Sequence, residues 1–289
     1  MRLLSGIADN HLKHLWKYNH SFTKQKLCFN VDGPNNVDYA NMFPQKEFII
    51  NPQGFRSEYD FRVLPKDSYK IGFFGCSFTQ GIGLVDQHIW THLLTERIKD
   101  KYHSNAICLN FGMGGCSNDY IFWNLVKAVE TFCLDFVFIL YTTVHRRLFV
   151  NPKPISSKFS HWINMHSWGP LRSKLVSQND FDVIGNWEFS DEADQLNTMH
   201  NVMCCRSLLE HRNIPYVDIG PLYSENKYIA DILPSRFTDG AYSAMEKENR
   251  SEYKKARDNI HPGVTFHRVL TNEFYKQYEE NQAINQKAH

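Results

Sequence analysis

The sequence predicts an α/β protein in which helices cover a mainly parallel central sheet. Short apolar runs such as Asp135–Tyr141, typical of strands buried on both faces, alternate with longer segments that repeat apolar residues at helical spacing. This alternation implies right-handed crossovers between parallel strands. Small-residue turns follow several of the apolar runs, and ligands of such sheets bind beyond the carboxyl ends of the strands. We therefore expect the functional residues along one edge of the sheet.

The regular pattern begins at Tyr69. The largely apolar run 69–74 ends in a serine-containing turn, and Asp86 is the expected N-cap of the helix that follows. Ser117 is the expected N-cap of the next helix, after a glycine-rich turn. In order, the predicted elements are strand 69–74, helix 86–99, strand 106–110, helix 118–132, strand 135–141, helix 191–211, strand 214–219 and helix 264–279.

Three stretches fall outside this pattern. Residues 1–65 are polar and irregular and form an N-terminal segment that precedes the α/β domain at 66–280. An insert at 150–190 combines prolines and aromatic residues with little periodicity, and inserts of this length are typically lids or binding loops. Residues 281–289 are expected to be a C-terminal tail.

Composition excludes several classes of function. The chain has 289 residues, enough for a full core, and a formal net charge of +1 with scattered lysines and arginines, so we expect no nucleic-acid partner. No stretch is long and apolar enough to span a bilayer, and the N-terminus is a poor signal peptide. The 7 cysteines include no CxxC pair and fall partly in apolar segments, which favours free thiols in the cytoplasm.

A serine and a distant histidine are the strongest candidates for catalysis. Ser77 lies in the turn Gly75–Gly81, directly after an apolar strand, where an α/β protein displays a nucleophile. A serine hydroxyl needs a base, and that base works best when a carboxylate orients its ring; Asp258-x-x-His261 offers both. The alternative is that Asp258 caps a helix and His261 is a surface residue.

The turn 110–117 contains Gly112, Gly114 and Gly115 between a strand and a helix start. Glycines let backbone N–H groups approach a ligand, and a helix N-terminus favours negative charge, so this turn suits an oxyanion hole. Alternatively, the glycines only permit tight packing of strand on helix. Neither this turn nor the one at Ser77 has the pattern of a nucleotide phosphate loop.

These segments together resemble the SGNH (GDSL-like) hydrolase family, in particular its bacterial and phage members. The matching segments, in the family's order, are Asn51–Arg56 (N-x-x-G-F-R), Gly75–Thr79, Asn110–Gly115 and Asp258–Pro262. The resemblance implies a flavodoxin-like three-layer sandwich and a serine-dependent esterase, deacetylase or acyltransferase that needs no metal or organic cofactor. It implies further that Ser77 is the nucleophile, His261 the base and Asp258 its orienter, with the N–H groups of Ser77 and Gly115 binding the oxyanion.

Two positions depart from the family pattern. Cys76 stands where the family has an aspartate before the serine, which changes the loop and not the chemistry. Thr143 stands where the family has an asparagine that donates to the oxyanion, and His145 and Arg146 are neighbouring donors that can replace it. We expect an active, atypical enzyme; the competing class is a glycan-binding or assembly protein that retains the fold.

The expected substrate is a small-molecule or glycan acyl ester, such as an O-acetyl group on a carbohydrate. Candidate substrate-binding residues are Arg56, His145, Arg146, Trp162 and Trp168. The arginines can bind an anionic substrate group or form ordinary surface ion pairs, and the tryptophans can stack on sugar rings or cover an apolar patch. We expect no metal site, because His88 and His92 lack further ligands nearby. His267 is expected to be an exposed helical residue.

Overall fold

The centre of the structure, a computed structural model, is a four-stranded parallel sheet. The described residues are 21–26, 47–150, 162–166, 191–220 and 261–287. The strand order, β4-β3-β5-β8, is 2-1-3-4 along the chain, as in flavodoxin-like sheets. The strands are β3 (Tyr69–Gly75), β4 (Ala106–Asn110), β5 (Phe136–Leu140) and β8 (Tyr216–Ile219).

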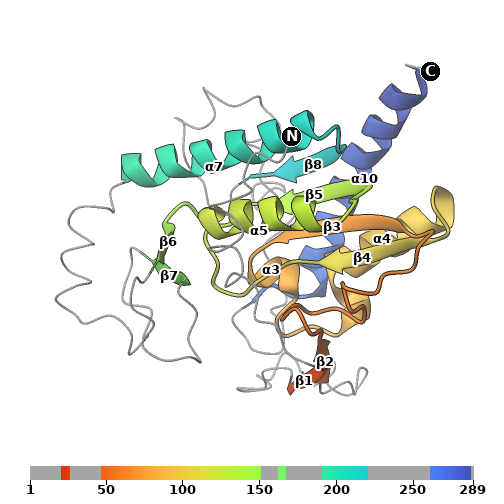
Figure 1. Cartoon of the computed structure of the whole chain (residues 1–289), viewed down its shortest axis with the longest axis horizontal. Helices are drawn as coiled ribbons and strands as arrows, with labels where there is room; N and C mark the ends of the chain where they lie inside the picture. The colour runs from red at the N-terminus through yellow and green to blue at the C-terminus, as the bar shows by residue number, and fades with distance from the viewer. Residues whose placement is uncertain (1–20, 27–46, 151–161, 167–190, 221–260, 288–289) are drawn as a thin grey trace.

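Helices cover both faces of this sheet (Figure 1). One pair packs together on one face and consists of α5 (Asn118–Thr131) and α7 (Asp191–His211). The other pair covers the opposite face and consists of α4 (Trp90–Lys101) and α10 (Val264–Lys287). The predicted α/β class, with a mainly parallel sheet inside a three-layer sandwich, is confirmed.

Aromatic side chains fill the layer between the sheet and the α4–α10 pair. Phe73 of β3 lies edge-on to Trp90 of α4, with ring centroids 5.3 Å apart, and stacks on Phe138 of β5. Trp90 in turn stacks on Phe274 of α10 at 4.5 Å. Every residue of β5 is buried, as the uninterrupted apolar run predicts. This packing fixes the carboxyl ends of β3 and β5 beside each other.

The N-terminal stretch contributes to the same core. Strands β1 (Thr23–Lys26) and β2 (Glu47–Ile50) pair antiparallel in a separate two-stranded sheet. Phe55 and Phe61 are buried, with ring centroids 5.3 and 5.0 Å from that of Phe111. Residues that the sequence places in an irregular segment thus pack on the turn that follows β4.

The predicted helix 86–99 is wrong at its start. Asp86–His88 form a short 3-10 helix, η1, and Ile89 is extended with ψ 137°, so α4 begins at Trp90 with Ile89 at its N-cap position. Asp86 does not cap α4, because its carboxylate accepts a hydrogen bond from Arg56 Nε at 2.8 Å. Ser117, by contrast, is confirmed as the N-cap of α5, where its hydroxyl accepts from the N–H of Tyr120.

Two further segments differ from the prediction. The insert starts with a hairpin, because β6 (Arg146–Val150) pairs antiparallel with β7 (Trp162–His166). Helix α10 continues to Lys287, so the expected tail from residue 281 is largely helical. The last turns of α10 have a contact on the sheet, since Asn281 Nδ2 donates to the carbonyl of Tyr216 at 3.3 Å. Within the described ranges, no helix combines the length and apolar character that crossing a bilayer requires.

Candidate active site

Ser77 opens a single helical turn at the carboxyl end of β3. The turn, α3 (Ser77–Gln80), follows the extended residue Cys76 and ends at Gly81, whose φ of 75° is left-handed. Gly75 is required before it, since a Cβ there would lie 2.0 Å from Thr79 Oγ1 and 2.9 Å from the Leu140 carbonyl oxygen. The sequence Gly-Cys-Ser therefore folds into a tight strand-to-helix turn, in which Ser77 is 5% exposed.

The glycine-rich turn after β4 packs directly against α3. A Cβ on Gly112 would lie 2.4 Å from Gln80 N, and one on Gly114 would lie 3.9 Å from Ser77 Cβ. The N–H of Gly114 donates to Gln80 Oε1 at 2.8 Å. Gly115 follows with a φ of 74°. The two turns that the sequence analysis singled out are thus neighbours.

Asn110 connects these two turns. Its Nδ2 donates to the carbonyl of Thr79 at 2.9 Å, and its Oδ1 accepts from the N–H of Gly112 at 2.9 Å. The side chain is 4% exposed. Sequence reasoning missed this role, although a polar residue that ends an apolar strand was a visible signal.

The carboxyl end of β5 forms the third part of this edge. Thr142 is fully buried and is fixed by Asn118, which accepts from the Thr142 N–H at 2.8 Å and donates to its carbonyl at 3.2 Å. Thr143 is 8% exposed, and its Oγ1 accepts from the N–H of His145 at 3.3 Å. Thr143 is therefore part of a tight local turn.

His261 comes to the same region from the far end of the chain. Its ring lies edge-on to that of Phe78, the residue after Ser77, with centroids 5.9 Å apart. Phe78 also contacts Phe266 at the start of α10, at 5.5 Å. The structure thus brings His261 close to the turn that contains Ser77. Asp258, its predicted orienter, lies outside the described residues.

His267 is buried, and the expectation that it is exposed is wrong. Its side chain is 1% exposed between α4 and α10, and Nδ1 accepts from the Trp90 N–H at 3.2 Å. Burial, with smaller contributions from Arg56, His261 and His88, lowers the pKa of His267 to about 3. The imidazole is therefore neutral at physiological pH, with its proton on Nε2.

Arg56 is 4% exposed, and its contacts are with the protein itself. The guanidinium donates to the carbonyls of Gly81 at 2.6 Å and Leu84 at 2.7 Å, and it pairs with Asp86. Through these contacts Arg56 supports the loop after α3. Its role in substrate binding stays a prediction.

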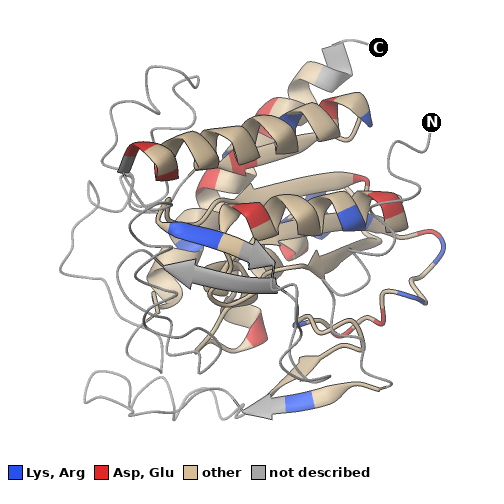
Figure 2. Cartoon of the chain, turned by 60° about the vertical axis from the view of Figure 1, so that its left-hand side comes forward, with Lys and Arg blue, Asp and Glu red and all other residues tan. Residues whose placement is uncertain are grey.

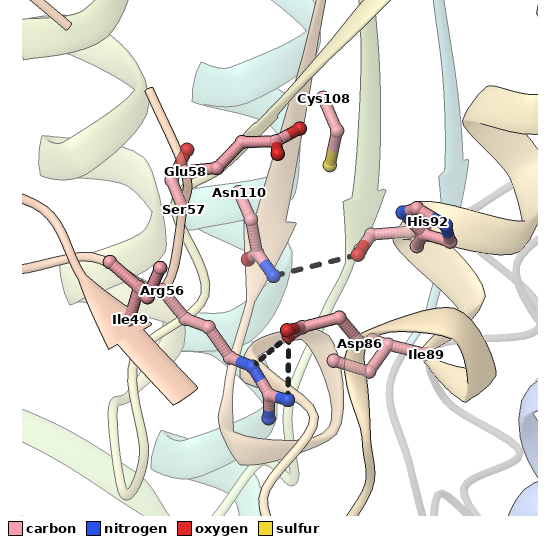
Figure 3. Close-up of a pocket in the computed structure, with 10 residues that line it drawn as sticks. Ile49, Arg56, Ser57, Glu58, Asp86, Ile89, His92, Cys108 and Asn110 are labelled. Atoms are coloured by element: carbon pink, nitrogen blue, oxygen red, sulfur yellow. Dashed lines mark hydrogen bonds and ion pairs between the residues drawn. The ribbon is translucent and has the colours of Figure 1, made fainter. Parts of the chain in front are cut away.

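A cavity of about 170 Å³ lies beside this support, between the Arg56 stretch and α4 (Figure 3). Arg56, Asp86 and Asn110 contribute to its wall, together with His92 and Cys108. Arg56, Asp86 and Asn110 also contact the Ser77 turn, the loop after it, or each other. Burial raises the pKa of the Cys108 thiol to about 12, so the thiol is protonated.

His145 and Arg147 converge on a buried carboxylate. Asp194 of α7 has a 1% exposed side chain, with Oδ2 3.1 Å from His145 Nδ1 and Oδ1 3.0 Å from Arg147 Nε. Burial raises the pKa of Asp194, while His145 and Arg147 oppose that shift. Figure 2 shows the basic start of β6 close to the acidic first turn of α7. Sequence spacing gave no signal for this cluster, because its members are far apart in the chain.

For the remaining predicted residues, the structure gives mainly their positions in helices and strands. Arg146 opens β6, and its Nη1 donates to the Cys116 carbonyl and to Thr142 Oγ1. Trp162 opens β7, and Trp168 lies outside the described residues. His88 belongs to η1 and His92 to α4, so they do not share one helix. The described side chains include no group of three His, Cys, Asp or Glu that could hold a metal ion.

Comparisons with known proteins give little further information. No family model and no curated protein matches the chain. Among solved structures, the esterase EstA from Pseudoalteromonas sp. is 12% identical, with 74% of this chain and 98% of that chain covered and a TM-score of 0.43. An acetyl xylan esterase, AlAXEase, is 15% identical, with 72% and 98% covered and a TM-score of 0.43. Likeness at this level carries no conclusion about the present chain.

Proposed function

We propose that the protein is a serine ester hydrolase of the SGNH type. One observation supports this proposal most: Ser77, the glycine-rich turn and His261 come from three distant parts of the chain and meet around a single helical turn. A Cβ built on Gly114 would lie 3.9 Å from Ser77 Cβ, and the His261 ring lies edge-on to that of Phe78. The resemblance in sequence motifs implies a site built from these same three segments, and their proximity supports the proposal.

The proposed reaction has two steps. Ser77 Oγ attacks the ester carbonyl carbon while His261 takes the hydroxyl proton, and the carbonyl electrons move onto oxygen. The N–H groups of Ser77 and Gly115 donate to this oxyanion, together with a third donor from the end of β5, for which Thr143 is the positional match. The oxyanion collapses, the alkoxide leaves with the proton from His261, and an acyl-serine remains.

The second step consumes the acyl-serine. A water molecule gives a proton to His261 and attacks the acyl carbon, and collapse of the new oxyanion releases the acid and restores Ser77. A sugar hydroxyl in place of water would give acyl transfer with the same residues. Asp258 is proposed to hold the His261 ring, because a carboxylate at this spacing can accept from Nδ1.

For the substrate we propose a short acyl ester, such as an acetyl group on a carbohydrate. The turns around Ser77 are tightly packed, which suits a small acyl group. The sequence of the insert contains Trp162 and Trp168, and aromatic side chains of this kind stack on sugar rings. We further propose that the protein works in the cytoplasm, as its cysteine content suggests.

Kinetics on a chromogenic acetyl ester test the proposal. Ser77→Ala and His261→Ala should each lower kcat by about 10⁴-fold or more, because the nucleophile and its base act as a unit. Ser68→Ala and His200→Ala are matched controls away from the site and should keep the wild-type kcat. If the wild type cleaves no ester, or if Ser77→Ala matches it, the hydrolase proposal is wrong and a glycan-binding role takes its place.

A further inference from the structure

Arg146 lies between two parts of the proposed oxyanion hole. Its Nη1 donates to Thr142 Oγ1 at 2.9 Å, at the end of β5, and to the carbonyl of Cys116 at 3.3 Å. Cys116 directly follows Gly115, and a Cβ built on the preceding residue, Gly114, would lie 3.9 Å from Ser77 Cβ. The guanidinium therefore bridges the glycine-rich turn and the strand end where the family's asparagine would stand.

Only part of the hydrogen-bonding capacity of Arg146 is used. Its Nε is buried and has no hydrogen-bond partner in the described part of the chain. Both recorded bonds come from Nη1, whereas a guanidinium has five N–H donors. The neighbouring Arg147 differs, because its Nε pairs with Asp194 at 3.0 Å. Among the described residues, no carboxylate forms an ion pair with Arg146, and a partly buried cation of this kind is suited to a developing negative charge.

The other described side chains at this junction are less suitable as donors. Asn118 has an amide, but its Nδ2 donates to the Thr142 carbonyl and to Thr198 Oγ1, and its Oδ1 accepts from Thr142 N. Thr143 has a short side chain whose oxygen accepts the His145 N–H. His145 Nδ1 lies 3.1 Å from Asp194 Oδ2. Arg146 alone among these four combines length, charge and unused N–H groups.

We propose that Arg146 is a catalytic residue that supplies the third oxyanion donor, in place of the asparagine found in SGNH hydrolases. This inference rests on the proposed hydrolase function. When Ser77 attacks, the carbonyl electrons move onto oxygen, and the guanidinium donates an N–H to that oxygen without losing its proton. A full positive charge replaces the neutral amide of the family, so the departure at Thr143 need not cost activity.

Substitutions at Arg146 and Thr143 distinguish the two candidate donors. Arg146→Gln should lower kcat by about 10²–10³-fold with little change in KM, since the interaction exists only in the transition state. Thr143→Val should lower kcat by less than about 10-fold, because the hydroxyl is not the donor. Arg62→Gln removes an exposed arginine and should keep the wild-type kcat. Equal kcat for wild type and Arg146→Gln would overturn the proposal, as would a larger loss in Thr143→Val.

Chemical rescue separates catalysis from a structural role. Millimolar guanidinium should restore activity to Arg146→Ala in a saturable way and should leave Thr143→Val unchanged. Absence of rescue in a variant with a native circular dichroism spectrum would overturn the proposal. If both neutral variants fail to fold, the pH profile of Arg146→Lys decides: kcat should fall relative to wild type as pH rises past about 10, where lysine loses the proton that arginine keeps, and a profile equal to that of wild type would overturn the donor role.

The two proposals fail in different ways. If wild-type protein hydrolyses no ester and a fluorophosphonate does not label it, the hydrolase function itself is wrong. If the wild type is active and Arg146→Gln is equally active, the hydrolase function stands and only the role of Arg146 is wrong.

Discussion

At the scale of single residues, His267 shows how packing determines the charge of a side chain. The sequence places it in a helix, three residues before Leu270 and seven before Phe274, but its polar ring favours an exposed position. In the structure it lies 1% exposed beside α4, with Arg56 and two other histidines near enough to oppose its protonation. Its lowered pKa keeps the imidazole neutral, as the hydrogen bond from the Trp90 N–H requires.

This residue should make stability depend on pH. The pKa of His267 is about 3 when folded and about 6.5 when unfolded, so below pH 6.5 the unfolded chain binds an extra proton. The neutral, buried His267 therefore contributes fully to the free energy of unfolding above about pH 6.5. As pH falls from 6.5 toward 3, this contribution decreases by up to about 1.4 kcal/mol per pH unit. Relative to His267→Asn, wild type should lose about 2 kcal/mol of unfolding free energy between pH 7.5 and pH 5.

Urea unfolding of both proteins at several pH values measures this difference. The substitution keeps a hydrogen-bond acceptor near the Nδ1 position and removes the titrating group. His200→Asn, at an exposed site, should follow the wild-type pH dependence. If the unfolding free energies of wild type and His267→Asn change equally with pH, the buried, neutral state of His267 is contradicted.

At the scale of elements, the contact between α3 and the glycine-rich turn depends on two different properties of glycine. A Cβ on Gly112 would lie 2.4 Å from Gln80 N, so the constraint there is steric. Gly115 has a φ of 74° and no atom within 4 Å of its Cβ position, so the constraint there is conformational. Only the steric constraint at Gly112 involves α3, the helical turn that Ser77 opens.

Gly112→Ala and Gly115→Ala should therefore differ. We expect Gly115→Ala to cost about 1–2 kcal/mol of unfolding free energy, the strain of a left-handed alanine. Gly112→Ala should cost about 1–3 kcal/mol and also displace α3, because backbone atoms cannot make room otherwise. Thermal unfolding of both variants and the rate of Ser77 acylation in Gly112→Ala measure these effects. A wild-type acylation rate in Gly112→Ala would show that the contact does not position Ser77.

Elements with a clear period were predictable, and elements that depend on tertiary contacts were not. Strand 106–110 has the predicted bounds because its apolar run is uninterrupted, and helix 191–211 has them because acidic residues mark its N-terminus. The predicted start of α4 was wrong because Arg56, which is distant in sequence, binds Asp86. The β6–β7 hairpin was missed because its strands pair with each other outside the main sheet.

At the scale of the whole molecule, the N-terminal stretch and the α/β sandwich share one core. Phe55 is fully buried, and its ring lies 5.3 Å from that of Phe111, next to the glycine-rich turn. Arg56 binds the carbonyls of the loop after α3. The irregular composition of the first 65 residues gave no indication of either contact, because each depends on residues beyond position 80.

Removal of the Phe55 ring should show how much this contact of the N-terminal stretch stabilises the sandwich. Phe55→Ala should lower the free energy of unfolding by about 3–5 kcal/mol, the usual cost of removing a buried phenylalanine ring. Val63→Ala changes a side chain that is 77% exposed in the same stretch and should stay within about 0.5 kcal/mol of wild type. Equal stability of the two variants, measured by urea unfolding, would show that the stretch does not contribute to the core.

The residues of the candidate site that lie in turns after strands could be predicted from the sequence. Ser77, Gly115 and Thr143 each follow a strand that has an apolar pattern, and parallel strands bring such positions to one edge. Asn110 and Asp194 could not be assigned from spacing, since their partners come from other elements. The contacts of Arg146 likewise appear only once β6 is placed beside the glycine-rich turn.

Covalent labelling of Ser77 tests the central claim most directly. The protein would be treated with a fluorophosphonate, and the site of the adduct would be identified by peptide mass spectrometry for wild type, Ser77→Ala and Ser68→Ala. An activated Ser77 predicts one adduct on the peptide that contains Ser77 in wild type and in Ser68→Ala, and no adduct in Ser77→Ala. An unlabelled wild type, or an adduct that persists in Ser77→Ala, would contradict the assignment of Ser77 as the nucleophile.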